Sequence, residues 1–393
     1  MIVILKTDVR PDGPEVREIL EQAARYPKIT SRVHTYQGET HTLTEVHLLG
    51  ETKLVPAEPF AARAYVVKVV RVSERYRILG RHQGQVEALG FEYRGIRFGQ
   101  DTLHVFPGLC AVDRRDHVEQ TFAAIAAQGL RTARMGAYKP RTSPYDFQGH
   151  GKECLPYVFE LAAKHGIRVV ATEITHERHL DEIRRELEPF GEATGVMVQI
   201  GTRNAQNFEL LKAAGQQREF PVLYKRGMGN TLEEALNACE YIASEGNRNI
   251  VFCLRGVKSG LGDPHRNLID FAHVPVVTRL TRLPVCVDPS HSAGRRTLAP
   301  DGLTDIHHAA AAGVIVGANM VLVDVHPRPE QALCDGPQAL TLEELPALLE
   351  DIRIVREAYL ARTRRAEASA SPGRGSTPAA RGEERLAIRP REA

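Results

Sequence analysis

The chain reads LHVFPGLCAVDRRDHVEQTFAAIAAQGLRTARMGA over residues 103–137. Residues 103–112 are a short apolar run, and residues 117–129 carry a helical apolar pattern that ends on Gly129, a common helix stop. Residues 130–137 form a second apolar run. Short, nearly continuous apolar runs are typical of parallel strands buried on both faces. This stretch therefore predicts a strand, a helix and a second, parallel strand.

The same alternation continues through residue 362 and gives eight strands and eight helices. The predicted strands are 103–112, 130–137, 167–174, 195–201, 221–227, 249–256, 284–290 and 318–327. A span of roughly 260 residues suits an α/β fold of the (β/α)₈ or TIM-barrel type. A doubly wound open sheet is the alternative, but it requires a glycine-rich first strand–helix turn. The segment PGLCAVD at 107–113 does not supply one.

Three further segments flank this predicted catalytic barrel of residues 103–362. Residues 1–72 follow the order βαββαβ, which is typical of a ferredoxin-like regulatory or assembly domain. Residues 73–102 are polar and glycine-rich, with FEYRGIRFG at 91–99 suited to a hairpin, and we expect a connector and barrel cap. Residues 363–393 are rich in Arg, Ala, Gly, Pro and Ser without periodicity, which predicts a disordered tail.

Composition excludes several classes of partner. The chain has 393 residues, 42% of them hydrophobic, and a net charge of +2, so we expect neither a nucleic-acid-binding nor a membrane-binding surface. No apolar run approaches the length of a membrane span, and no signal-peptide pattern is present. The six cysteines are scattered without framework spacing, which favours reduced thiols in a cytoplasmic protein, any one of which could bind a metal.

Cationic side chains gather where the predicted strands end. In a parallel barrel the strand C-termini and the loops after them form the active site. The residues are Arg134, Lys139, Arg141, Arg203, Lys225, Arg226 and Arg255. Any one of these arginines could serve an ordinary ion pair, but seven positive charges at one mouth require anions to offset their repulsion. Arg binds phosphates and carboxylates in forks and Lys binds them as a point charge, so we expect an anionic substrate.

A second set of strand-end residues carries metal-binding chemistry. Its members are Cys110, His291, Asp324 and Asp335. They follow strands one, seven and eight, which are neighbours in a closed barrel. A mixed sulfur, nitrogen and oxygen set selects a transition divalent ion, namely Mn, Fe, Co or Zn, over Mg²⁺ or Ca²⁺. His326 is a weaker alternative ligand, since it shares the face of the strand that carries Asp324.

Several motifs occur in an order that resembles a known family. They are KPRTSPYDFQG at 139–149, QIGTRNAQNFELLK at 199–212, KRGMGNTLEE at 225–234, VDPSHSAGRR at 287–296 and DGPQALT at 335–341. The chain is similar, from residue 1 to about residue 361, to the class I 3-deoxy-D-arabino-heptulosonate 7-phosphate (DAHP) synthases that have an N-terminal ferredoxin-like domain. KPRTS separates it from the related KDO8P synthases, which carry a KANRS-type sequence and accept a pentose phosphate. The N-acetylneuraminate synthases fit less well.

The resemblance implies a metal-dependent condensation of phosphoenolpyruvate with erythrose 4-phosphate, the first step of the shikimate pathway. It assigns phosphoenolpyruvate to Arg134, Lys139, Arg203, Lys225 and Arg255, and erythrose 4-phosphate to Arg141, Thr142 and Ser143. It assigns the metal to Cys110, His291, Asp324 and Asp335. Catalytic roles fall to Lys139 as proton donor, to His291, and to Asp288, which would orient Lys139, the aldose hydroxyls or a water. The family also implies a homotetramer or homodimer and a small-molecule effector at the N-terminal domain.

The chain departs from the family pattern where acceptor and metal meet. Asp324 stands where a glutamate is usual, and Leu254 replaces another glutamate. The other departures are Leu109, Ala111, Met135 and the rewritten loop 257–267, in which Arg266 and Asn267 persist. Two alternatives follow: a paralogue that condenses phosphoenolpyruvate with a different phosphorylated aldose, and a barrel that has lost turnover and acts as a regulatory partner.

Overall fold

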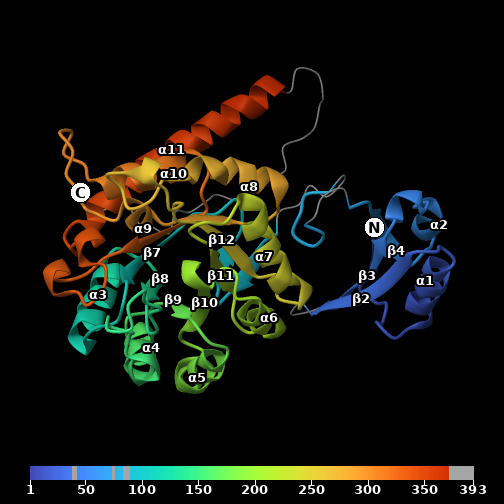
Figure 1. Ribbon diagram of the computed structural model, residues 1–393, viewed down its shortest axis with the longest axis horizontal. Helices are drawn as coiled ribbons and strands as arrows, with labels where there is room; N and C mark the ends of the chain where they lie inside the picture. The colour runs from blue at the N-terminus through green and yellow to red at the C-terminus, as the bar shows by residue number, and fades with distance from the viewer. Residues whose placement is uncertain (38–41, 73–75, 83–88, 371–393) are drawn as a thin grey trace.

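The computed structural model describes residues 1–37, 42–72, 76–82 and 89–370, and Figure 1 shows two bodies, a large barrel and a small sheet to one side of it. The small sheet comprises β1 (Ile2–Leu5), α1 (Pro14–Ala24), β2 (Ile29–Gln37), β3 (Thr42–Gly50), α2 (Glu58–Ala61) and β4 (Val66–Val70). Its strand order is β2-β3-β1-β4, with β1 antiparallel to both β3 and β4. This is the ferredoxin-like arrangement that the sequence predicted.

The large body is a closed barrel of eight parallel strands, which confirms the predicted (β/α)₈ fold. The strands are β7 (His104–Leu109), β8 (Thr132–Met135), β9 (Val169–Ile174), β10 (Gly195–Ile200), β11 (Val222–Lys225), β12 (Ile250–Leu254), β13 (Val285–Val287) and β14 (Met320–Asp324). The helices between and after them are α3 (Arg115–Ala127), α4 (Leu155–Lys164), α5 (Arg178–Leu187), α6 (Phe208–Gln216), α7 (Leu232–Ser244), α8 (Val274–Leu280), α10 (Asp305–Ile315) and α11 (Leu345–Ala370). A short helix, α9 (Pro289–Ala293), follows β13.

Closure of the barrel brings the first and last strands together. β14 pairs with β7 in parallel, and the register ends with Asp324 opposite Gly108. Gly108 has φ +148°, and a Cβ there would lie 2.1 Å from the carbonyl oxygen of Arg134. Only glycine allows this close approach of β7 to β8. The consequence is that Cys110, directly after β7, lies near residues some two hundred positions later in the chain.

A hairpin closes the barrel at the N-terminal end of its strands. It consists of β5 (Phe91–Tyr93) and β6 (Ile96–Phe98), within the segment predicted to form one. Ile96 and Phe98 are buried against the interior layer of the barrel, which includes Phe106 and Met197. Because this end is filled with apolar side chains, an active site can open only at the other end, where the strands terminate.

The predicted tail is partly helical. Helix α11 continues to Ala370, so residues 363–370 are an extension of the last barrel helix and not an irregular segment. Residues 371–393, the remainder of the predicted tail, lie outside the described residues.

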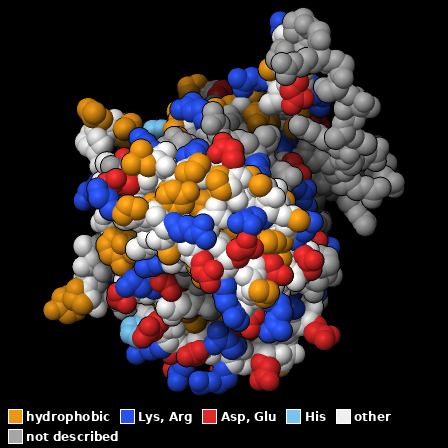
Figure 2. Space-filling view, turned by 90° about the vertical axis from the view of Figure 1, so that its right-hand side faces the viewer, with side chains coloured by type: hydrophobic (Ala, Val, Ile, Leu, Met, Phe, Trp, Pro, Cys, Tyr) orange, Lys and Arg blue, Asp and Glu red, His pale blue; other side chains and the backbone are white. Residues whose placement is uncertain are grey.

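No helix in the described part of the chain is both long enough and apolar enough to cross a membrane. On the face shown in Figure 2, acidic and basic side chains are interspersed and form no broad basic field.

Candidate active site

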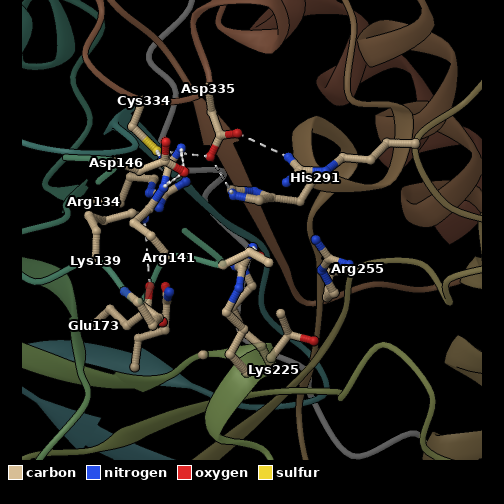
Figure 3. A pocket seen from close by; sticks show the side chains of 17 residues that line it. Arg134, Lys139, Arg141, Asp146, Glu173, Lys225, Arg255, His291, Cys334 and Asp335 are labelled. Carbon is tan, nitrogen blue, oxygen red and sulfur yellow. Dashed lines mark hydrogen bonds and ion pairs between the residues drawn. The ribbon is translucent and has the colours of Figure 1, made fainter. Parts of the chain in front are cut away.

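A cavity of about 240 Å³ opens at the C-terminal ends of the barrel strands (Figure 3). Cationic side chains dominate its lining and come from four of the strand ends and two loops. They are Arg134, Lys139, Arg141, Arg203, Lys225, Arg255 and Arg266. The carboxylates of Asp146, Glu173 and Asp335 also reach it. The excess of positive charge is the electrostatic character expected for a site that binds phosphates and carboxylates.

Arg255 is a buried cation that forms no ion pair with any residue the structure describes. It follows β12 directly, is 2% exposed, and lies at the cavity edge in Figure 3. Its Nε and Nη1 atoms have no hydrogen-bond partner within the described residues. Burial lowers the pKa of this guanidinium from its usual value. An unpaired buried cation is costly, so its presence at a cavity indicates a place for an anion.

Lys139 and Arg134 line the side of the cavity next to β7. The Lys139 Nζ lies 3.3 Å from the Cys110 Sγ and 3.6 Å from a Glu173 carboxylate oxygen. Burial alone would lower the pKa of Lys139, but the neighbouring Cys110 and Glu173 raise it above its usual value. Arg134 forms a buried ion pair with Asp324. Lys139 therefore contributes a positive charge to the lining of the cavity.

Asp288 positions two other residues and does not contact Lys139, Arg141 or the cavity itself. Its side chain caps α9 by accepting from the His291 backbone N–H at 3.0 Å. It also lies 3.0 Å from the His291 Nδ1 and forms an ion pair with Lys225. Of the three predicted roles of Asp288, the described residues show no contact with Lys139 for the first, and orientation of the aldose hydroxyls or of a water stays a prediction. Because Nδ1 faces this carboxylate, His291 turns its Nε2 outward, as metal-binding histidines do.

The donor atoms predicted to bind a metal converge at the edge of the cavity. The Cys110 Sγ lies 3.6 Å from the His291 Nε2 and 3.1 Å from the Asp335 Oδ2. The His291 Nε2 lies 3.6 Å from the same oxygen. Asp324 approaches the other side of the imidazole, 3.7 Å from Nδ1. A thiol, an imidazole and carboxylates at these separations suit a transition divalent ion, so the residues present fit the metal that the resemblance implies.

Cys334 is a member of this cluster that the sequence prediction missed. Its Sγ lies 4.0 Å from the Cys110 Sγ and 3.2 Å from the Asp335 Oδ2. The contact between the two sulfurs raises the pKa of the Cys110 thiol and lowers that of Cys334. Its position beside Asp335 in the CDGPQ segment was the only sequence signal that could have pointed to it.

The residues predicted to bind the aldose phosphate are only partly at the cavity. Arg141 and Thr142 line it, and the Thr142 hydroxyl accepts a hydrogen bond from Arg203 at 3.3 Å. Ser143 is not among the lining residues, and its hydroxyl accepts from the Tyr145 backbone N–H within the loop.

Two sequence predictions are corrected by the structure. Arg226 does not line the cavity, since its guanidinium pairs with Asp270 at 2.9 Å and donates to the Asn230 carbonyl. His326 turns away from the metal-binding cluster and lies 2.8 Å from Asp113.

Two further groups of residues remain: the departures from the family pattern, and the lining residues to which the sequence assigned no role. Four of the departures from the family pattern, Leu109, Ala111, Met135 and Leu254, are buried apolar residues that do not line the cavity. Lining residues that the prediction did not assign a role are Asp146, Glu173, Gln199, Thr202 and Arg266. Arg266 holds the Asp335 Oδ1 at 3.0 Å, which leaves Oδ2 for the sulfurs and His291.

Fold and site together define a (β/α)₈-barrel enzyme with a cationic cavity at the strand C-termini. A model of the DAHP synthetase I family matches residues 77–359. The chain belongs to this family and is a DAHP synthase-type enzyme.

The chain is similar to several known proteins over 68% to 91% of its length. It is 36% identical over 358 residues to the phospho-2-dehydro-3-deoxyheptonate aldolase of Thermotoga maritima, covering 91% of this chain and 98% of the relative. The crystal structure of the DAHP synthase from Thermotoga maritima matches with a TM-score of 0.65 at 35% identity, covering 91% of this chain and 97% of that one. A 2-dehydro-3-deoxyphosphooctonate aldolase of Syntrophobacter fumaroxidans is 28% identical over 290 residues, covering 68% of this chain and 94% of the relative.

Proposed function

We propose that this enzyme condenses phosphoenolpyruvate with erythrose 4-phosphate to give DAHP and inorganic phosphate, the entry reaction of the shikimate pathway. The observation that carries the proposal is the buried, unpaired Arg255 guanidinium in a cavity lined by six other cations. A doubly anionic substrate would supply the missing charge and hydrogen-bond acceptors. The relative that covers nearly the whole chain bears the name of the enzyme for this reaction.

Five cations would hold the phosphate and carboxylate of phosphoenolpyruvate. They are Arg134, Lys139, Arg203, Lys225 and Arg255, all of which line the cavity. Held in this way, the enol carbon would face the aldehyde of the aldose, whose phosphate Arg141 and Thr142 would bind, with Ser143 in the same loop. Fixing both reactants in one geometry removes most of the entropic barrier to their encounter.

Lys139 would donate a proton to the oxygen that develops negative charge. The enol carbon of phosphoenolpyruvate bonds to the aldehyde carbon, and the former carbonyl oxygen takes the proton from the Lys139 ammonium. Water then adds to the carbon that bears the phosphate ester, and the C–O bond to phosphate breaks. The raised pKa of Lys139 keeps the amine protonated before the reaction, as a proton donor requires.

Three residues, Cys110, His291 and Asp335, would hold a divalent metal ion. When bound, the ion would act as a Lewis acid on the aldehyde carbonyl. Asp324 would be the fourth ligand, since its carboxylate belongs with Cys110 and His291 to a group whose donor atoms lie within 4.8 Å of one another, and it also contacts Arg134 and Gln338. Asp288 would keep the His291 Nε2 directed toward the ion through its contact with Nδ1.

The test is a phosphate-release assay on the purified full-length protein. The reaction mixture would contain phosphoenolpyruvate, Mn²⁺, Co²⁺ or Zn²⁺, and one member of a panel of four- and five-carbon aldose phosphates. Release with erythrose 4-phosphate is the expected result. Release only with another sugar would make the protein the paralogue considered above, and phosphoenolpyruvate binding without release for any sugar or metal would support the regulatory barrel.

A further inference from the structure

Gln338 is a buried amide connected to both carboxylates that are proposed to bind the metal, to one directly and to the other through an arginine. Its Nε2 donates to the Asp324 Oδ2 at 2.5 Å, and its Oε1 accepts from the Arg266 Nη1 at 3.2 Å. The same arginine nitrogen donates to the Asp335 Oδ1 at 3.0 Å. A continuous chain of hydrogen bonds therefore joins the two carboxylates.

The polarity of these contacts fixes the orientation of the Gln338 amide. A guanidinium can only donate hydrogen bonds, so the amide oxygen must face Arg266. The amide nitrogen then faces Asp324, whose ionised carboxylate can only accept. Gln338 is 1% exposed and Asp324 is 0% exposed, so neither group can turn to bulk solvent for a replacement partner. A side chain of the same size without this donor would leave one carboxylate oxygen of Asp324 short of a hydrogen bond.

The backbone explains why Gln338 lies beside Asp324. The Leu340 N–H donates to the Asp324 carbonyl at 2.9 Å, which sets the segment after Asp335 alongside the end of β14. The 3₁₀ turn Gly336–Gln338 lies within that segment and brings the amide to the carboxylate. The DGPQ motif therefore supplies a proposed metal ligand at its first position and, at its last, a hydrogen bond to another proposed ligand.

We propose that Gln338 is a positioning residue of the metal site, which holds the Asp324 carboxylate in the orientation that binds the ion. This rests on the proposed function only in requiring a metal there. Arg134 pairs with the Asp324 Oδ1, and Gln338 holds Oδ2, which lies 3.7 Å from the His291 Nδ1. With both oxygens held, the carboxylate keeps its place in the group that it forms with Cys110 and His291. Carboxylates that bind metals in proteins are themselves held by such outer hydrogen bonds.

The test is a titration of the metal-free, reduced, full-length protein with Co²⁺, followed by the cobalt absorbance without air and without substrate. Gln338→Met keeps the length of the side chain and removes its hydrogen bonds. Co²⁺ should then bind about 10–100-fold more weakly, the loss typical of an outer contact to a metal ligand. Gln338→Glu keeps the acceptor for Arg266 and removes the donor to Asp324, so a loss of the same size is expected. A purely structural contact would lower stability and leave the Co²⁺ affinity of the folded protein unchanged.

Asn247→Leu is the matched control, because it also removes a buried amide. The Asn247 Nδ2 donates to the carbonyls of Ala214, Gln217 and Phe220, in the segments that precede β11 and β12. These segments lie at the end of the barrel away from the cavity. The variant should therefore melt at a lower temperature and bind Co²⁺ with the affinity of the natural protein.

A double variant tests whether Gln338 acts through Asp324. Asp324→Asn leaves three of the four proposed ligands, so a weaker binding of Co²⁺ is expected. If Gln338 acts only by holding the Asp324 carboxylate, the addition of Gln338→Met to this variant should weaken binding by about twofold or less. Independent effects would instead add, and the second substitution would cost as much as it does alone.

Three results would overturn the proposal. They are natural Co²⁺ affinity in a folded Gln338→Met or Gln338→Glu protein, an equal loss from Gln338→Met with and without the Asp324 carboxylate, and no Co²⁺ binding by the natural protein. The two Gln338 variants differ in polarity, so misfolding of one leaves the other for the measurement. Because no substrate is present, failure of the phosphate-release assay would count against the proposed reaction and not against this role of Gln338.

Discussion

Arg226 and Arg255 both follow buried barrel strands directly, yet their guanidinium groups have opposite surroundings. Arg226 has a carboxylate partner in Asp270 and a backbone carbonyl at Asn230, so its charge and its N–H groups are satisfied. Arg255 keeps two N–H groups without a partner while facing the cavity. Removal of one partner from a buried ion pair destabilises the folded state. A buried cation without a partner instead gains hydrogen bonds and a counter-charge when an anionic ligand binds.

The variants Arg255→Ala and Arg226→Ala should therefore separate binding from stability. Loss of Arg255 removes a charged hydrogen bond worth about 1.5–3 kcal/mol, so KM for phosphoenolpyruvate should rise about tenfold to a hundredfold. The melting temperature should stay the same or increase, because an unpaired buried charge is removed. Arg226→Ala leaves Asp270 unpaired and should lower stability by about 3–5 kcal/mol with KM unchanged. Steady-state kinetics and thermal unfolding measure both, and an unchanged KM in Arg255→Ala would contradict the assignment of phosphoenolpyruvate to this residue.

Cys110 provides a second test at a single position. Cys110→Ala removes a sulfur that lies within 3.6 Å of both the His291 Nε2 and the Asp335 carboxylate. Loss of a residue that only orients a metal ligand costs about 10–100-fold in metal affinity or activity. Loss of a ligand itself should therefore lower metal-dependent turnover by about a hundredfold or more. Metal content after dialysis, measured by mass spectrometry, should fall in parallel. Cys239→Ala, which removes a buried sulfur from helix α7, is the control. Full activity in Cys110→Ala would mean that this cysteine binds no metal.

Among the secondary-structure elements, the β5–β6 hairpin and α9 lie at opposite ends of the barrel. The hairpin contributes to stability, and α9 positions side chains at the cavity. The hairpin fills the N-terminal end, where the Phe98 ring lies 5.1 Å from that of Phe91 and 6.2 Å from that of Phe106. Helix α9 is one short turn at the opposite end, and its cap Asp288 directs His291 and Lys225. One end of the barrel is therefore a packed core and the other a network of charges.

Phe98→Ala tests this division. Phe98 is 2% exposed, so its truncation should lower the free energy of unfolding by about 3–5 kcal/mol through loss of burial and creation of a cavity. Because Phe98 lies at the end away from the cavity, KM for either substrate should not change in the folded protein. Denaturant unfolding and steady-state kinetics at a temperature below the transition give the two readouts. A raised KM with unchanged stability would be the opposite of what this packing predicts.

On the scale of the whole molecule, a partly buried ion pair joins the N-terminal sheet to the barrel. Glu45 in β3 accepts from the Arg248 guanidinium at 2.8 Å and contacts the His47 ring at 3.0 Å. Glu45 is 5% exposed, although it belongs to a small sheet outside the barrel. The position of the sheet beside the barrel therefore depends partly on this charge, which matters if an effector acts through the N-terminal domain.

Glu45→Gln should lower the free energy of unfolding by an amount that depends on pH. Burial would raise the pKa of Glu45, but the hydrogen bond from His47 and the charge of Arg248 outweigh it and lower the pKa to about 2. The ionised form therefore stabilises the folded state fully above the unfolded pKa of about 4.3, and this contribution is lost as the pH falls toward 2. At pH 7 the variant should be less stable by about 2–3 kcal/mol, with the difference shrinking below pH 4. Unfolding curves from pH 3 to pH 8 check this, and a constant difference across that range would exclude Glu45 as its source.

The barrel, the ferredoxin-like sheet and most of the residues at the cavity could be predicted from the amino-acid sequence. Alternating apolar runs and helix patterns define strand order, and a parallel barrel brings every strand end to one mouth, whatever the separation along the chain. Tertiary structure alone decided where each side chain at that mouth points. Arg226 turns to Asp270, Asp288 to His291 and Lys225, and Asp324 to Arg134, because each side chain follows the partner that another strand or loop places within reach. Cys334 belongs to the metal-binding cluster for the same physical reason: closure of the barrel sets its loop against Cys110, more than two hundred residues earlier.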